Sequence, residues 1–323
     1  MKALITGGAG FIGSHLSERL LKQGHSVTVL DNLSTGCMEN MKTAADYPDF
    51  QFIRGSICDS KTVEQAVQGC DCIFHMAAAV GVRLIVERPI KTLETNISGF
   101  GTILRAAADM DIRVLLASSS EVYGRNNHIP MNEADDSVIG TTSKSRWSYA
   151  CSKMMDEFLA FAYWQEKKLP VTICRFFNII GPRQTGKYGM VVPRFITQAL
   201  AGEPLTVYGD GTQTRCFLNV RDLVAVLPQL LEDDRTAGTI YNLGSDREIS
   251  IQTLAETVLS VTGSNSDIQT VPFEEVYGTN FEDMQRRVPD ISRIHKQTGF
   301  TPTIGLEETL AEIAHSIKEN NPC

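Results

Sequence analysis

The stretch Thr6-Gly7-Gly8-Ala9-Gly10-Phe11-Ile12-Gly13 decides the fold of this chain of 323 residues. It joins a short apolar run, Ala3–Ile5, to a segment with helical periodicity, Ile12–Lys22. The three glycines spaced three apart let the turn tighten, let a ligand approach the backbone, and let the helix pack on the strand. The unpaired N–H groups at the start of the helix then favour an anion such as a pyrophosphate. A strand, a glycine turn and a helix in this order predict a dinucleotide-binding unit.

The alternation of strand and helix continues through the first 175 residues. Further β-rich apolar runs lie at Val27–Leu30, Phe50–Ile53, Cys72–His75, Val114–Ala117 and Val171–Cys174. Helical periodicity separates them at Ser60–Gln68, Pro89–Met110 and Tyr149–Lys167. Continuous apolar strands are typical of a parallel sheet that helices cover on both faces. We therefore predict an α/β fold with a doubly wound, Rossmann-like parallel sheet and a smaller mixed α/β C-terminal lobe.

An acid ends the second predicted strand, where it can select the dinucleotide. Asp31 follows Gly13 by 18 residues, and its carboxylate can accept hydrogen bonds from ribose hydroxyls while repelling a 2′-phosphate. NAD is thus favoured over NADP. We assign residues 1–178 to an NAD-binding domain, with a strand near 239–244 expected to return to its sheet, and residues 179–323 to a substrate lobe. The ligand cleft is expected between them, at the carboxyl ends of the strands.

The composition excludes several classes of partner. The net charge of −8 gives no electrostatic footprint for nucleic acid. No apolar stretch approaches the ~20 residues that a membrane span needs. No set of cysteines or histidines has metal-ligand spacing, so no metal is expected. Because the amino terminus begins directly as a strand, without a secretory h-region, we expect a cytoplasmic protein.

Tyr149 and Lys153 carry the predicted chemistry, because side chains four residues apart project from one face of a helix. A nearby ammonium favours the phenolate form of a tyrosine. An activated phenol beside NAD+ can take a proton from a sugar or alcohol hydroxyl while hydride leaves the carbon. The stretch Ser118-Ser119-Ser120-Glu121 follows the fifth strand, so one of its hydroxyls can hydrogen-bond the same substrate group.

The chain resembles an extended short-chain dehydrogenase/reductase, in the branch of NAD-dependent nucleotide-sugar epimerases, dehydratases and decarboxylases. Besides the glycine turn and the Tyr149/Lys153 pair, the resemblance rests on motifs spread along the chain: His75-Met76-Ala77-Ala78, Ser119-Ser120-Glu121-Val122-Tyr123-Gly124, Arg175-Phe176-Phe177-Asn178, Gly181-Pro182-Arg183, Val207-Tyr208-Gly209-Asp210-Gly211 and Arg286-Arg287-Val288-Pro289-Asp290.

This resemblance implies roles for individual residues. Tyr149 is the base, Lys153 binds the nicotinamide ribose and lowers the tyrosine pKa, and Ser119 is the catalytic serine, with Glu121 as a further catalytic candidate. The cofactor is expected against these two residues of the predicted helix and against Gly7, Gly10, Phe11, Ile12, Gly13, Asp31, Asn32, Ala77 and Asn96. The nucleotide-diphosphate sugar is expected against Arg83, Asn178, Arg183, Tyr208, Arg215 and Arg287.

The resemblance leaves the reaction open after oxidation at C4. The 4-keto sugar can be reduced from its other face, can lose water across C5–C6, or can lose CO2 from a C6 carboxylate. The dTDP-glucose dehydratases carry Asp-Glu where this chain has Ser120-Glu121, so dehydration is disfavoured. The Ser-Glu pair resembles UDP-glucuronate decarboxylases, whereas Tyr149-Ala150-Cys151-Ser152-Lys153 looks epimerase-like. We favour a C4 epimerase of UDP-glucose or UDP-glucuronate type, with UDP-glucuronate decarboxylase or 4,6-dehydratase as the alternative.

Two further expectations concern partners. A non-enzymatic NAD sensor could use the same scaffold, although retention of Ser119, Tyr149 and Lys153 argues against it. The predicted helices Pro89–Met110 and Tyr149–Lys167 carry wide apolar faces. The resemblance implies that these helices pair across a twofold axis, giving a homodimer through a four-helix bundle.

Overall fold

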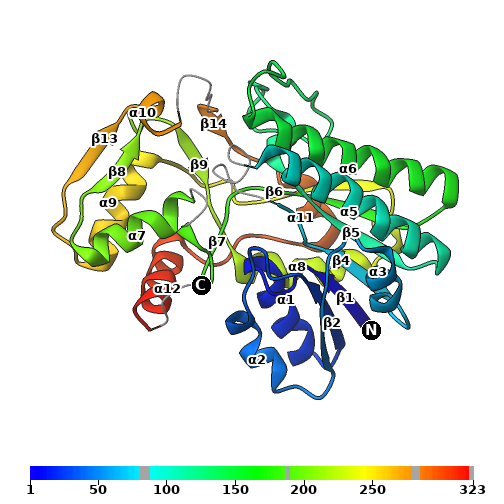
Figure 1. The fold of residues 1–323 in the computed structure, drawn as a ribbon. Coiled ribbons are helices and arrows are strands. Elements are labelled where there is room, and N and C mark those ends of the chain that lie inside the picture. The colour runs from blue at the N-terminus through cyan, green and yellow to red at the C-terminus, as the bar shows by residue number, and fades with distance from the viewer. Residues whose placement is uncertain (80–87, 187–189, 278–283, 320–323) are drawn as a thin grey trace.

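A seven-stranded parallel sheet forms the centre of the larger lobe in this computed structural model, which describes residues 1–79, 88–186, 190–277 and 284–319 (Figure 1). The strand order is β11-β6-β5-β4-β1-β2-β3. The strands are β1 (Lys2–Thr6), β2 (Ser26–Asp31), β3 (Phe50–Arg54), β4 (Cys72–His75), β5 (Arg113–Ser119), β6 (Val171–Phe176) and β11 (Thr239–Leu243). All neighbouring pairs run parallel, which confirms the predicted doubly wound architecture.

Helices cover both faces of this sheet because its side chains alternate between two apolar cores. Ile5 and Leu115 face one core, whereas Leu4 and Leu116 face the other. The first core contains residues of α1 (Phe11–Lys22), α8 (Val220–Glu232) and α11 (Ser292–Thr298). The second contains residues of α3 (Ser60–Ala66), α5 (Pro89–Asp109) and α6 (Arg146–Lys167). The remaining short elements of this region are the helix α2 (Lys42–Ala45) and the 3₁₀ helices η1 (Met38–Met41), η2 (Ser120–Tyr123) and η4 (Asp234–Thr236).

The chain returns from the second lobe to the first. Strand β11 pairs with β6 in parallel, so the expected strand near 239–244 does rejoin the sheet. Helix α8 is not predicted from the sequence, because its interior Pro228 interrupts the helical pattern. The Asn219 side chain caps α8 by accepting a hydrogen bond from the Arg221 N–H at 2.7 Å, and Leu223 and Leu227 are fully buried. We therefore propose a division into two lobes in which α8 and β11 belong to the first.

The smaller lobe has its own apolar core, in which Ile196, Leu254 and Leu310 are fully buried. It contains α7 (Val191–Ala201), α9 (Ile251–Thr262), α10 (Phe273–Tyr277) and α12 (Leu306–Glu319), with paired strands β8 (Leu205–Tyr208) and β13 (Ile268–Val271). Strands β9 (Thr214–Cys216), β12 (Glu248–Ser250) and β14 (Arg286–Arg287) form a second sheet, and β7 (Ile179–Ile180) pairs with β10 (Leu218–Asn219). Within the described ranges, no helix combines the length and the apolar character that crossing a membrane requires.

Candidate active site

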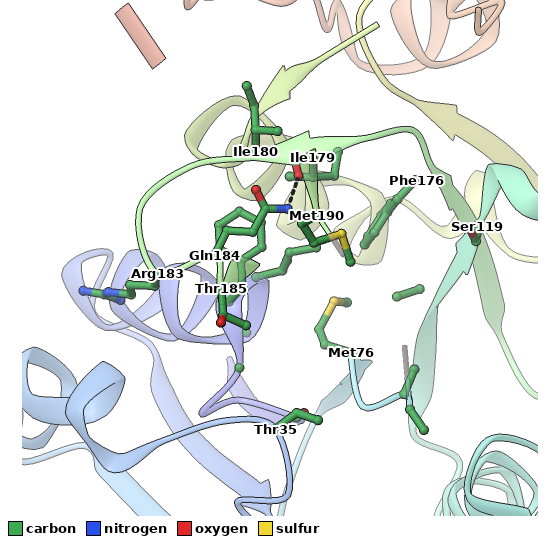
Figure 2. Close-up of a pocket in the computed structure, with 18 of the residues that line it drawn as sticks. Thr35, Met76, Ser119, Phe176, Ile179, Ile180, Arg183, Gln184, Thr185 and Met190 are labelled. Atoms are coloured by element: carbon green, nitrogen blue, oxygen red, sulfur yellow. Dashed lines mark hydrogen bonds between the residues drawn. The ribbon is translucent and has the colours of Figure 1, made fainter. Parts of the chain in front are cut away.

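A cavity of about 1100 Å³ lies at the carboxyl ends of the parallel strands and is lined by residues of both lobes. Figure 2 shows part of its lining, with Phe176 above Met76 and Ser119 to the right of both in this view. This is the position predicted for the ligand cleft. No group of histidine, cysteine or acidic side chains in the described part of the chain could hold a metal ion.

The glycine turn forms the cavity wall between β1 and α1. Gly7 has a φ of +69°, and a Cβ atom there would lie 2.7 Å from the Cα of Ala77, so a larger residue does not fit. Helix α1 starts after Gly10 without a side-chain cap, which leaves its first N–H groups for a ligand. Phe11, Ile12 and Gly13 of that first turn line the cavity, as does Ala77. This arrangement fits a dinucleotide pyrophosphate.

Asp31 fixes the turn and also lines the cavity. One carboxylate oxygen accepts a hydrogen bond from the Ala9 N–H at 3.0 Å and the other accepts one from the Leu33 N–H at 2.7 Å. Burial raises the pKa of Asp31, and these two N–H donors partly oppose the shift. Asn32 also lines the cavity and accepts a hydrogen bond from the Ser34 N–H at 2.9 Å. Each carboxylate oxygen keeps a lone pair for ribose hydroxyls, which fits the NAD prediction.

Asn96 lies behind the cavity wall and is absent from the lining, although it was expected to bind the cofactor. Its side chain is 1% exposed and exchanges two hydrogen bonds with the backbone of Ala79, at 2.8 and 3.3 Å. Its amide also donates to the hydroxyl of Ser152 at 3.1 Å. Asn96 therefore ties the loop after β4 to α6 rather than presenting its side chain to a ligand.

Ser119 and Tyr149 meet at the cavity wall, where a hydrogen bond joins their side chains. Ser119 ends β5, and its hydroxyl also accepts a hydrogen bond from the Glu121 N–H at 3.2 Å. Burial raises the pKa of Tyr149, and the negative charges of Glu121 and Asp156 raise it further. The Ser119 hydrogen bond and the Arg287 guanidinium only partly oppose these effects.

Lys153 lines the cavity next to Tyr149, but its ammonium has a carboxylate partner that was not predicted from the sequence. Its Nζ lies 3.1 Å from Oδ2 of Asp156, three residues further along α6, and both side chains are buried. Asp156 shares the ammonium charge, and burial is the largest cause of the raised Tyr149 pKa, so the effect of Lys153 on this pKa stays a prediction. The i,i+3 spacing is the signal that could have revealed this pair.

Glu121 is held between two guanidinium groups. Its carboxylate lies 3.3 Å from Nη2 of Arg146 and forms a hydrogen-bonded ion pair with Arg287. Although burial acts to raise the pKa of Glu121, the two arginines outweigh it and lower this pKa to about 2. The carboxylate is therefore ionised at neutral pH and is a weak base, which argues against the catalytic role expected for it. Arg146, which precedes Tyr149 by three residues on the same helix, was not predicted as a site residue.

Arginines from two paired strands line the sugar-nucleotide side of the cavity. Strands β9 and β14 run parallel and place Arg215 opposite Arg287. Nη2 of Arg287 donates to the Asn178 side-chain oxygen at 2.6 Å, and the Asn178 amide donates to the backbone oxygen of Cys216 at 2.9 Å. The structure thus brings Arg215, Arg287 and Asn178 together, as predicted for a diphosphate site. Tyr208 also lines the cavity, with the Arg194 guanidinium carbon 3.7 Å from its ring centre.

Arg183 and Arg83 differ from this group. Arg183 lies on the cavity rim, where its Nη2 is 2.5 Å from a carboxylate oxygen of Glu18 on α1. Figure 2 shows Arg183 directed over α1 and away from Ser119. Its main contact therefore joins the loop after β7 to the first domain. Arg83 lies outside the described residues.

Known proteins resemble this chain over nearly its whole length. The model of the family described as GDP-mannose 4,6 dehydratase matches residues 4–313. A UDP-N-acetyl-alpha-D-glucosaminuronate decarboxylase of Bacillus cytotoxicus is 43% identical over 319 residues, covering 98% of each protein. UDP-glucuronic acid decarboxylase 1 of Danio rerio is 38% identical over 309 residues, covering 96% of this chain and 71% of that protein. The structure of UDP-glucuronic acid 4-epimerase from Bacillus cereus, in complex with UDP-glucuronic acid and NAD, has a TM-score of 0.89 and 27% identity, with 99% of each chain covered.

Proposed function

The chain belongs to the family described as GDP-mannose 4,6 dehydratase, and from that premise we propose that it decarboxylates a UDP-linked uronic acid. It is an NAD-dependent enzyme of nucleotide sugars. The sequence motifs favoured the C4 epimerase, with the decarboxylase as the alternative. The two relatives at 43% and 38% identity are both decarboxylases, which supports that alternative better.

The observation that carries the proposal is the pair of guanidinium groups, from Arg146 and Arg287, beside Glu121 and Tyr149. The single charge of Glu121 neutralises only one of these two guanidinium groups, and Arg215 adds a further positive charge to the lining, so this end of the cavity suits an acidic sugar better than a neutral hexose. Arg287 lines the cavity, where its guanidinium also donates to the Asn178 side-chain oxygen. We propose Arg287 as the group that receives the C6 carboxylate or the neighbouring diphosphate oxygen.

The glycine turn and Asp31 would hold NAD, and the chemistry that this cofactor would supply is the removal of hydride from C4 of the sugar and its later return. The phenolate form of Tyr149, which the Lys153 ammonium and a bound nicotinamide cation would favour, takes the proton of the C4 hydroxyl, and the Ser119 hydroxyl orients that group. With C4 as a ketone, the C5–C6 bond breaks and its electron pair moves onto the ketone oxygen as CO2 leaves. C5 then gains a proton from solvent water, and Tyr149 returns the proton that it took to O4 when C4 is reduced again.

The ionised state of Glu121 bears on the competing reactions. Loss of water across C5–C6 needs an acid to protonate the leaving hydroxyl, and a carboxyl group with a pKa of about 2 is not protonated at neutral pH. Decarboxylation needs no such acid. C4 epimerisation is the second candidate, supported by the likeness to the Bacillus cereus epimerase and by the Tyr149-Ala150-Cys151-Ser152-Lys153 pattern.

The test uses purified protein with NAD and three substrates: UDP-glucuronate, UDP-N-acetylglucosaminuronate and, as a neutral control, UDP-glucose. With ¹³C at C6, decarboxylation releases labelled CO2 and leaves a UDP-pentose that NMR detects. We expect release from at least one uronic acid and no reaction of UDP-glucose. A C4-epimeric product that retains the label would overturn the proposal in favour of the epimerase.

A further inference from the structure

A buried carboxylate lies against the lysine of the Tyr149/Lys153 pair. Lys153 and Asp156 are 1% and 0% exposed, and their charged groups are 3.1 Å apart. Oδ1 of Asp156 has no hydrogen-bond partner among the described residues, and the side chain does not line the cavity. A carboxylate buried with so few partners opposes folding unless its ion pair compensates. Its position next to a cavity-lining lysine indicates a role at the site.

The geometry of α6 aligns the three side chains. Side chains on a helix lean toward its N-terminus, so Asp156 reaches back to Lys153, and Lys153 reaches back toward Tyr149 one turn earlier. Asp156 thus approaches the ammonium from the C-terminal side of the helix. The Lys153 ammonium acts less strongly on the Tyr149 phenol when Asp156 is ionised beside it, because the two opposite charges partly cancel at the phenol.

We propose that Asp156 is a positioning residue, which holds the Lys153 ammonium in place and limits how strongly that ammonium favours the Tyr149 phenolate. This inference rests on the proton transfer by Tyr149 that the proposed function includes. It adds a residue through which the chain adjusts the strength of its base. Asp156 itself touches neither substrate nor cofactor in this proposal.

The other charged groups around Tyr149 can be separated from Asp156. The charges of Glu121 from η2 and Arg287 from β14 act on the Tyr149 phenol, and the Lys153 charge acts on His75 from β4. Burial and the Lys153 charge lower the pKa of His75 well below its ordinary value, so that ring is neutral near neutral pH. Glu121 is ionised there, since its pKa is about 2. Of the two carboxylates that raise the Tyr149 pKa, only Asp156 contacts Lys153.

Asp156 can also titrate. Burial raises the pKa of Asp156, Lys153 opposes that rise, and Glu157 from the same helix adds to it. The neutral replacement Asp156→Asn removes the carboxylate charge at every pH. Tyr149 then experiences the whole Lys153 charge, so the phenolate forms at lower pH.

The first experiment compares pH profiles of kcat/KM for the NAD-loaded wild type and Asp156→Asn. We expect the acid limb of the Asp156→Asn profile to lie about one pH unit below that of the wild type. At a fixed pH on this limb, kcat/KM of the variant should therefore be about tenfold higher. Asp156→Glu retains the charge and should keep the wild-type limb. Glu166→Gln removes an exposed carboxylate from the same helix and should not shift it either.

The second experiment needs no substrate. In protein labelled with ¹³Cζ-tyrosine, the Tyr149 resonance is assigned by its loss in Tyr149→Phe, and its titration is followed with and without NAD. We expect the midpoint in Asp156→Asn to fall by about one pH unit relative to the wild type. Asp156→Ser provides a second neutral variant if the asparagine variant does not fold. An unchanged Tyr149 midpoint in a folded neutral variant would reject the role of Asp156, whatever substrate the enzyme proves to use.

Discussion

Tyr149 and Ser119 share a hydrogen bond at the cavity wall, and burial raises the pKa of the Tyr149 phenol. If Tyr149 moves the proton of the C4 hydroxyl, Tyr149→Phe should lower kcat by about 10²- to 10⁴-fold, the usual share of general acid–base catalysis. Substrate affinity, measured by calorimetry, should change little, because the ring remains. Tyr163→Phe, on the same helix, is the control and should retain wild-type activity. Full activity of Tyr149→Phe would refute the assigned chemistry.

Glu121 makes a pH-dependent contribution to stability. Its folded pKa of about 2 lies below the ordinary value of 4.5, because Arg146 and Arg287 outweigh the effect of burial. The stabilisation is therefore fully present above about pH 5 and is lost as the pH falls toward 2. Glu121→Gln should lower the melting temperature at pH 7, and the difference from the wild type should shrink as the solution is acidified. A difference that is constant across pH 3 to 7 would contradict the ion-pair assignment.

At the scale of elements, the β1–α1 turn depends on the absence of a side chain at Gly7. Gly7→Ala would place a methyl group 2.7 Å from the Ala77 Cα and strain a φ of +69°, so NAD affinity should fall at least ~10-fold. Gly24→Ala is the matched control, since Gly24 has a φ of +80° and nothing lies within 4 Å of the position that its Cβ atom would take. Gly24→Ala introduces the backbone strain without the steric clash, so its affinity for NAD, measured by calorimetry, should equal that of the wild type.

Helix α6 is fixed to the sheet by a buried ion pair. Arg175 on β6 makes two hydrogen bonds to Glu157, at 3.0 and 2.7 Å, and Glu157 accepts a third from the Ser118 hydroxyl at 2.5 Å. This contact joins the helix of Tyr149 to the strand of Ser119. Glu157→Gln leaves a buried guanidinium without its counter-charge, so chemical unfolding should show a loss of about 3–5 kcal/mol.

The control for this prediction is an exposed pair. Arg221 and Glu308 lie 3.3 Å apart, and both side chains are more than half exposed. Glu308→Gln should therefore change the free energy of unfolding by less than about 1 kcal/mol. Equal losses in the two variants would show that burial does not set the strength of the Glu157–Arg175 pair.

At the scale of the whole molecule, α5 and α6 pack side by side along one edge of the larger lobe (Figure 1). They leave large apolar side chains in solvent: Ile90 is 72% exposed and Phe158 65%. We propose that a second copy of the chain covers these side chains in a four-helix bundle. Phe158→Glu should then convert a dimer to a monomer in light scattering at micromolar concentration. Val276→Glu, on α10 of the smaller lobe, should not, and a monomeric wild type would contradict the proposal.

The sequence alone determined the sheet, the glycine turn and the Tyr149/Lys153 spacing, because each follows from periodicity or steric need within a few residues. The tertiary structure decided which charged side chains pair and which side chains of the site are buried. Glu121 meets Arg287 across 166 residues, and Arg183 meets Glu18 across 165, and no local pattern encodes such contacts. Folding also buries Tyr149 and Asp156, so the environment that sets the strength of the base arises only when distant segments close around α6.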